Sequence, residues 1–205
     1  MVNVWLVIFI VWALYRYSFF FLEWVDELIF KPVVFLGPIA LVLKKEKKNW
    51  SSVGLKKDNF FGDLYLGIFL GLLFALEGLA ANYLKYGRFS FAPILDLGGL
   101  GILGYLGLSL ATSFSEEVLG RGFLFMRMHR ELKSLWQAAV YSSLLFVGLH
   151  LPIALRNLSS WTMMIYLLSV FILGVVNSLI FSMKKTLTLP ILIHTFWNMT
   201  VALYL

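Results

Sequence analysis

Long apolar stretches alternate with short polar segments along the whole chain. Each stretch holds about 15 to 24 residues with almost no charge, the length that a helix needs to cross a hydrocarbon core of roughly 30 Å. The stretches have no polar face at helical spacing, as the helices of a soluble bundle would. We therefore predict an all-α, polytopic membrane bundle of about seven spans, at residues 2–22, 28–43, 62–83, 93–116, 135–153, 161–183 and 187–205.

The second stretch is the weakest of these predictions. It is short and contains Pro32 and Pro38, which lack a backbone N–H and interrupt helical hydrogen bonding. It could instead form a re-entrant segment, and the chain would then have six spans.

The few charged residues orient the chain in the bilayer. Only 14% of the residues are charged and 60% are apolar, whereas soluble domains have about 25% charged residues. Eleven basic residues lie in the connections at 44–61, 122–134 and 184–185. With seven spans these connections share one side, which the positive-inside tendency makes cytoplasmic. The connections on the other side hold only four basic residues: Lys31, Lys85, Arg88 and Arg156.

This distribution also limits the partners of the chain. The net charge of +6 is concentrated at the predicted membrane surface, so it indicates contact with membrane lipids and not with nucleic acid. Phe123 and Phe125 beside Arg127 predict an interfacial segment on the cytoplasmic surface. There is no cysteine, which excludes a disulfide framework, thiolate metal sites and a cysteine nucleophile.

Two adjacent glutamates end the fourth predicted span. Glu117 and Arg121 are four residues apart, so they share a helix face and can pair. Glu116 is turned by about 100° from its neighbour and faces a different wall. An unpaired carboxylate in a membrane costs roughly 2.5–3.5 kcal/mol on insertion scales. Because Arg121 balances only one carboxylate, the other needs either a proton or a function.

The fifth and seventh spans each carry a histidine. Phe146 lies one turn before His150, and His194 lies one turn before Asn198. Each pair alone also fits a structural role, since such side chains often form hydrogen bonds between membrane helices. Simple counting puts Glu116 toward the cytoplasmic end of its span and His150 near the far end of span five. A shared site therefore requires span five to start later or to tilt.

Together these motifs resemble those of the CAAX-processing and bacteriocin-processing protease family (CPBP, or Abi), which includes the Ras-converting type II CAAX prenyl endopeptidases. The resemblance covers about residues 93–205, which we expect to be the catalytic core of a single transmembrane domain, with residues 1–92 as additional N-terminal spans. It rests on EExxxR, FxxxH and HxxxN, in this order: Glu116-Glu117…Arg121, Phe146…His150 and His194…Asn198.

The resemblance implies an intramembrane glutamic endopeptidase. Glu116 would be the general base, and His150 would help to bind and polarise the attacking water. His194 and Asn198 would donate hydrogen bonds to the oxyanion of the tetrahedral intermediate. The supporting residues would be Glu117, Arg121 and Phe146. The expected substrate is a peptide bond of a membrane-associated or prenylated CAAX-type protein or of a leader peptide, and the oligomeric state stays open.

A metal mechanism is the alternative within this reading. Glu116, His150 and His194 could form a His₂Glu zinc set with an open fourth position, but no HExxH helix is present. We therefore expect no cofactor and no resident metal. The small size and the lack of cysteine favour a prokaryotic plasma membrane, and we expect the active site to face the cytoplasm.

Two other classes of function compete with a protease. The chain could be a non-enzymatic immunity or scaffold protein that binds a peptide or a membrane partner. It could also be a small proton-coupled carrier with a relay of Glu116, His150 and Glu77, although no repeated halves are visible, as they are in many carriers.

Overall fold

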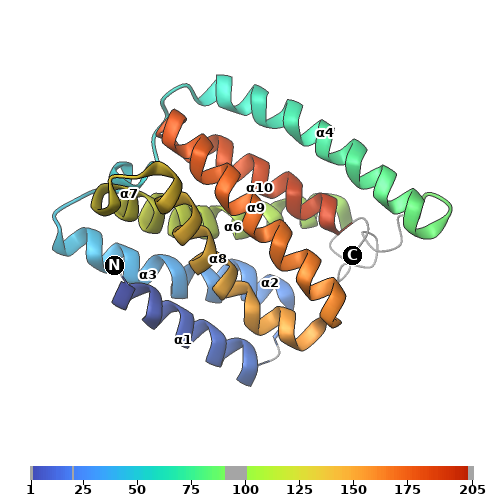
Figure 1. Ribbon diagram of the computed structural model, residues 1–205, viewed down its shortest axis with the longest axis horizontal. Coiled ribbons are helices and arrows are strands. Elements are labelled where there is room, and N and C mark those ends of the chain that lie inside the picture. Colours follow the sequence, from blue (N-terminus) through green and yellow to red (C-terminus); the bar gives the residue numbers. More distant parts are fainter. Residues whose placement is uncertain (1, 20, 91–100, 203–205) are drawn as a thin grey trace.

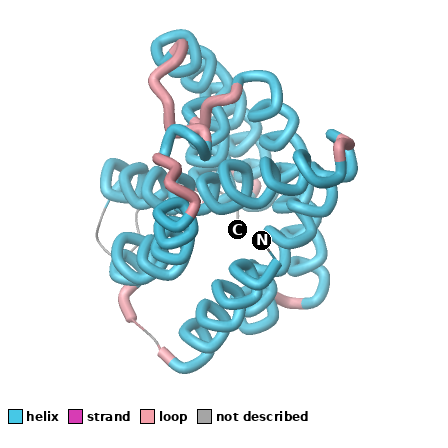
Figure 2. Tube along the Cα trace, turned by 90° about the vertical axis from the view of Figure 1, so that its left-hand side faces the viewer, coloured by secondary structure: helices cyan, strands magenta, loops and turns pink. Residues whose placement is uncertain are grey.

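The computed structural model describes residues 2–19, 21–90 and 101–202, and within these ranges the chain forms helices and no strands. This confirms the predicted all-α membrane bundle. Helix α1 (Val2–Ser18) lies at one edge and α4 (Phe60–Tyr86) at the opposite edge (Figure 1). Short loops join most of the helices (Figure 2).

Three described helices are long and apolar enough to cross a membrane: α4, α8 (Leu135–Asn157) and α9 (Ser160–Lys184). They match the spans predicted at 62–83, 135–153 and 161–183. Helix α4 carries large apolar side chains on its outer face, such as Leu72 and Leu76, which are 61% and 64% exposed. Such a surface suits lipid chains and would be a liability in water.

The weak second span is a continuous helical run. It begins with α2 (Glu23–Val25), widens into a π-helix, η1 (Asp26–Phe30), and continues as α3 (Lys31–Lys45). Pro32 lies in the first turn of α3, where its missing N–H is tolerated, and Pro38 lies inside the helix. The run therefore contains no break that would turn the chain back on itself.

The fourth predicted span continues well beyond Glu116. Helix α6 (Gly101–Glu117) passes directly into a second π-helix, η3 (Val118–Phe125), and then into α7 (Met126–Leu132). The prediction of an interfacial segment is wrong, because Phe123 and Phe125 are 0% and 1% exposed. Glu116 and Glu117 suggested the end of this span, but both are paired inside the protein, so they do not mark the membrane surface. The predicted start of this span, at 93, lies outside the described residues.

Helix α10 (Thr188–Val201) packs against both α4 and α6. Glycines allow α4 to approach it closely, since a Cβ added to Gly67 or Gly71 would lie 2.5 Å from Leu192 or 2.4 Å from Phe196. Small residues at four-residue spacing are a usual means of packing membrane helices. The start of α4 is tied to the loop before α10 by buried Asp63, which pairs with Lys184 at 2.9 Å and accepts a hydrogen bond from Thr186 at 2.9 Å.

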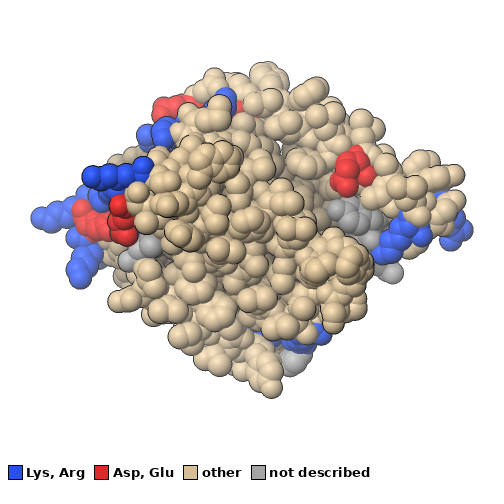
Figure 3. Space-filling model, in the orientation of Figure 1, with Lys and Arg blue, Asp and Glu red and all other residues tan. Residues whose placement is uncertain are grey.

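Lys and Arg side chains gather at one end of the bundle, where α3, α7 and α9 finish (Figure 3). We call this the basic end. It carries Lys44, Lys45, Lys47, Lys48, Lys56, Lys57, Arg127, Arg130, Lys133, Lys184 and Lys185.

Candidate active site

Glu117, the last residue of α6, is the centre of a buried polar network. Its Oε1 accepts hydrogen bonds from Arg121 Nη1 at 2.8 Å and Asn177 Nδ2 at 3.0 Å, and it lies 2.8 Å from His194 Nδ1. Glu117 is fully buried, and the guanidinium of Arg121 lies 4.5 Å from the centroid of the Phe146 ring. One carboxylate thus joins α6 and η3 to α9 and α10. The predicted i,i+4 pair of Glu117 and Arg121 is present.

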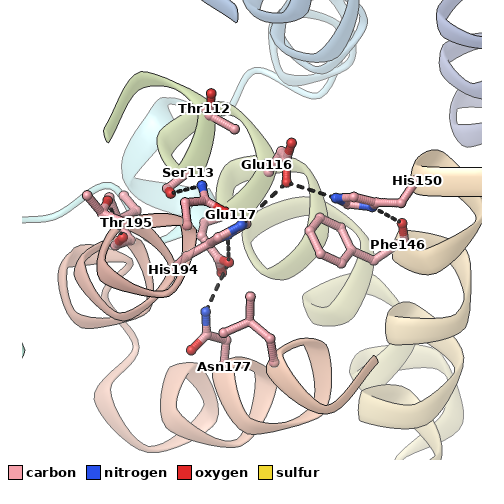
Figure 4. Close-up of polar contacts among 12 residues, drawn as sticks. Thr112, Ser113, Glu116, Glu117, Phe146, His150, Asn177, His194 and Thr195 are labelled. Atoms are coloured by element: carbon pink, nitrogen blue, oxygen red, sulfur yellow. Dashed lines mark hydrogen bonds and ion pairs between the residues drawn. The ribbon is translucent and has the colours of Figure 1, made fainter. Parts of the chain in front are cut away.

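Glu116 points away from Glu117 and toward the two histidines (Figure 4). Its Oε1 accepts a hydrogen bond from Lys31 Nζ at 2.8 Å. Its Oε2 lies 3.5 Å from His150 Nε2 and 3.6 Å from His194 Nε2. This second oxygen is buried and accepts no hydrogen bond from the described residues. The structure therefore brings together the three residues that the motifs predicted to share a site.

The Nδ1 atoms of His150 and His194 determine how the two imidazole rings are oriented. His150 Nδ1 lies 2.9 Å from the carbonyl oxygen of Phe146, and His194 Nδ1 faces Glu117. A carbonyl or carboxylate oxygen can only accept, so both Nδ1 atoms donate. In the neutral rings each Nε2 is then an acceptor. Glu116 Oε2 thus lies within 3.6 Å of an Nε2 atom on each histidine, an arrangement suited to a water molecule that donates its protons to these acceptors.

A cavity of about 180 Å³ lies beside this point. Glu116, His150 and Asn198 contribute polar atoms to its lining, and Tyr166 and Trp197 contribute aromatic rings. Glu117 and His194 do not line it and are 0% and 1% exposed. The arrangement has two layers. Glu116 and His150 meet the cavity, and the network around Glu117 supports them from behind.

Asn198 lies one turn after His194 on α10, as predicted. Its Nδ2 donates a hydrogen bond to Ser113 Oγ of α6 at 3.3 Å, and its backbone oxygen lies 3.4 Å from Tyr105 Oη. The amide therefore reaches the cavity wall but is directed at a serine hydroxyl. Its predicted role as an oxyanion donor stays a prediction.

Phe146 packs between the two imidazoles. Its ring centroid lies 4.7 Å from that of His150 and 6.0 Å from that of His194, edge to face in both cases. The FxxxH spacing thus places an aromatic spacer where it restricts the rotation of both rings.

The observed helix ends explain why His150 lies at the same level of the bundle as Glu116. Helix α8 continues to Asn157, and the helix that carries Glu116 continues through η3 to Leu132. Both residues therefore lie inside their helices, away from the ends that the apolar pattern predicted. Counting from those ends misplaced both of them.

Lys31 is the main residue that the sequence interpretation missed. It was assigned to an outer connection, yet it is 5% exposed and pairs with both Glu116 and Glu27. Thr112 Oγ1 donates a hydrogen bond to Glu27 at 2.6 Å and completes this group. Glu27 and Lys31 are four residues apart, and that i,i+4 spacing was the available signal. Asn177 was also missed, although a polar residue within an apolar span is a signal of a functional or packing role.

Two observations bear on the metal alternative, which itself stays a prediction. Among residues 2–19, 21–90 and 101–202, no group of three His, Cys, Asp or Glu side chains could hold a metal ion. The ammonium group of Lys31 already pairs with Glu116, so a metal cation there would meet a like charge. The carrier relay is also incomplete, because Glu77 is exposed on α4 and does not line the cavity.

Comparison with known proteins agrees with this geometry. A family model described as type II CAAX prenyl endopeptidase, Rce1-like, matches residues 98–200. This half of the chain holds all three motifs but not Lys31. Searches of curated proteins and of solved structures gave no match. The chain belongs to the Rce1-like type II CAAX prenyl endopeptidase family.

Proposed function

We propose that this chain is an intramembrane endopeptidase that hydrolyses a peptide bond of a membrane-associated or prenylated protein or of a leader peptide. One observation carries the proposal: Glu116 Oε2 and the Nε2 atoms of His150 and His194 converge at 3.5–3.6 Å beside a cavity. Membership of a prenyl endopeptidase family supports peptide hydrolysis as the reaction.

In the proposed mechanism Glu116 and His150 hold the attacking water. Lys31 binds Oε1 of Glu116, and this contact keeps Oε2 directed at the imidazoles. As the water oxygen bonds to the carbonyl carbon of the substrate, Glu116 takes one of its protons. The same proton then passes to the leaving amine as the C–N bond breaks. A carboxylate held close to its target in this way acts as general base and then as general acid.

Asn198, which lines the cavity, would stabilise the oxyanion, and His194, which lies behind Glu116, would join it once the bound substrate reaches its Nε2 atom. The amide of Asn198 can turn from Ser113 toward the developing charge. His194 can donate from Nε2 only when both ring nitrogens carry protons, because Nδ1 donates to Glu117. Loss of one oxyanion donor typically slows proteases about 10²- to 10³-fold.

We infer that this hydrolysis needs no metal. The proposal is supported by the pairing of Lys31 with Glu116 and by the donor set described above. The expected result is that a chelator leaves the cleavage rate unchanged. Inhibition that zinc reverses would contradict it.

Replacement of Glu116 by Gln tests the function. The substitution keeps the size of the side chain but removes the base, so cleavage should fall by about 10²- to 10⁴-fold. Glu77→Gln is the matched control, since Glu77 is an exposed glutamate on α4 outside the cavity. Membranes that contain each variant would be compared by mass spectrometry for newly formed peptide termini. If Glu116→Gln and the wild type release the same termini, Glu116 is not the base.

A further inference from the structure

Asn177 is a fully buried amide in the second half of α9, and it belongs to none of the three motifs. Its Nδ2 donates one hydrogen bond to Glu117 Oε1 at 3.0 Å and another to the backbone oxygen of Pro190 at 3.1 Å. An amide nitrogen carries two protons, so both donors of Asn177 are used. One side chain thus holds a carboxylate of α6 and the backbone of α10 at a fixed separation.

Both acceptors of Asn177 also contact His194. Glu117 Oε1 lies 2.8 Å from Nδ1 of the His194 ring, and dashed lines join this carboxylate to His194 and to Asn177 in Figure 4. The carbonyl of Pro190 lies four residues before His194 in α10, so helical pairing gives it to the backbone N–H of that residue. Asn177 therefore binds both the helical turn that carries His194 and the carboxylate that the ring contacts.

Close packing fixes the part of α9 from which Asn177 projects. A Cβ added to Gly174, almost one turn earlier, would lie 2.7 Å from Ser143 Oγ of α8. Small residues of this kind allow membrane helices to approach each other closely. Arg121 Nη2 also donates to the backbone oxygen of Leu173 at 3.4 Å, which ties the same turn to η3. Asn177 consequently extends from a helix that is itself held in place.

We infer that Asn177 is a positioning residue for His194. Arg121 also donates to Glu117 Oε1, but it lies on the same helical run and does not place the carboxylate relative to α10. With Oε1 held by Asn177, the ring proton stays on Nδ1, and Nε2 faces Glu116 Oε2 at 3.6 Å. The hydrogen bond of one ring nitrogen determines the state of the other. The inference rests on the proposed function and adds a residue outside the motifs to the support of the reacting groups.

Replacement of Asn177 by Leu removes both donors and keeps the branched shape of the side chain. Glu117 retains its contacts with Arg121 and His194, and the carbonyl of Pro190 retains its helical partner. No buried acceptor is therefore left without a donor, and the variant should fold. Unfolding in detergent would be measured for each variant before any other comparison.

Ser178→Ala is the matched control. Ser178 follows Asn177 directly, is 1% exposed and donates to the backbone oxygen of Gly174 at 2.8 Å. Loss of its hydroxyl removes a buried hydrogen bond within α9 that does not reach α10. A general loosening of α9 would therefore affect both variants, whereas the inference concerns Asn177 alone.

The state of the His194 ring supplies the first readout. The chain has three histidines, so nitrogen NMR of protein with isotope-labelled histidine can be assigned by replacing each in turn with Gln. The wild type and Ser178→Ala should show His194 with its proton on Nδ1, and Asn177→Leu should show a second state of the ring. Unchanged His194 signals in Asn177→Leu would overturn the inference. Because no substrate is needed, this comparison stands even if the wild type releases no peptide and the proposed function fails.

Cleavage supplies the second readout, on a peptide that spans a site identified by comparison with Glu116→Gln. We expect Asn177→Leu to lower kcat by about 10- to 100-fold, the loss typical when the partner that orients a metal-bound imidazole is removed, with KM unchanged. Ser178→Ala should cleave at the wild-type rate. Equal kcat values for Asn177→Leu and the wild type would contradict the assigned role.

Asn177→Asp decides the question if Asn177→Leu does not fold. A protonated aspartic acid can still donate to Glu117, whereas an ionised one repels it. The cleavage rate of Asn177→Asp relative to the wild type should therefore rise as the pH falls. Arg121 and His194 also face this position, but both proteins contain them, so their titration affects both rates. A ratio that stays constant with pH would show that the side chain only fills space.

Discussion

Replacement of Lys31 by Met tests whether Lys31 forms a buried ion pair with Glu116 and Glu27 beside the cavity. The Nζ of Lys31 lies 2.8 Å from Glu116 Oε1 and also pairs with Glu27, and the side chains of Lys31 and Glu116 are 7% and 6% exposed. Methionine keeps the unbranched shape of the side chain, one atom shorter, but leaves two carboxylates without their cation. Removal of one partner from a buried pair costs about 3–5 kcal/mol. We expect that loss in the free energy of unfolding, together with loss of cleavage.

Lys48→Met is the matched control, because its Nζ pairs with Glu46 at the same distance of 2.8 Å but the side chains are 40% and 33% exposed. An exposed pair contributes about 0–1 kcal/mol. Unfolding in detergent would be followed by tryptophan fluorescence, for which Trp12, 5.5 Å from Lys31 Nζ, is a local reporter. Adding Glu27→Gln to Lys31→Met should restore part of the stability. Equal losses in Lys31→Met and Lys48→Met would refute the assignment.

Two further predictions concern packing and pH. Gly71→Ala should lower the free energy of unfolding by about 1–3 kcal/mol, because the added Cβ meets an α10 ring at 2.4 Å. The control is Gly37→Ala, because a Cβ added there would have nothing within 4 Å. It should be neutral or stabilising by up to about 1 kcal/mol. Similar losses of stability in Gly71→Ala and Gly37→Ala would argue against the close contact of Gly71 with Phe196. Hydrogen bonds from Lys48, and to a lesser degree from Arg127, lower the pKa of Glu46. The ionised carboxylate of Glu46 therefore stabilises the folded protein by a small amount above the usual carboxyl pKa, and this contribution is lost as the pH falls through the lowered pKa. The stability difference between the wild type and Glu46→Gln should therefore shrink between about pH 6 and pH 3, and a difference that grows on acidification would contradict this.

Sequence reasoning recovered the parts of the site that depend on spacing along one helix. The four-residue intervals from Glu117 to Arg121 and from Phe146 to His150 predicted shared helix faces, and the contacts are present. The turn of about 100° between Glu116 and Glu117 predicted their separate surroundings. These relations follow from the geometry of a single helix, so they need no knowledge of the neighbouring helices.

Helix ends were predicted less well, for a physical reason. The length of an apolar stretch in the sequence indicates where a lipid-facing helix ends. A helix that is covered by protein can continue through charged residues when these residues are paired. Glu117 and Arg121 pair inside the bundle, and the helix therefore runs on through η3 to Leu132. The apolar pattern ended that span at the glutamates and put Phe123 at the membrane surface.

The sequence by itself determined a bundle of membrane helices and the residues that share one helix face within it, such as Glu117 with Arg121, and it supplied the residues to which we propose a catalytic role. Only the tertiary structure decided that Lys31 meets Glu116 across 85 positions, that Asn177 meets Glu117, and that Glu116 and His150 line one cavity. The reason is that apolar periodicity does not specify which membrane helices pair, since lipid chains are as apolar as leucine. Close contacts such as that of Gly71 with Phe196, and buried hydrogen bonds between helices, make that choice.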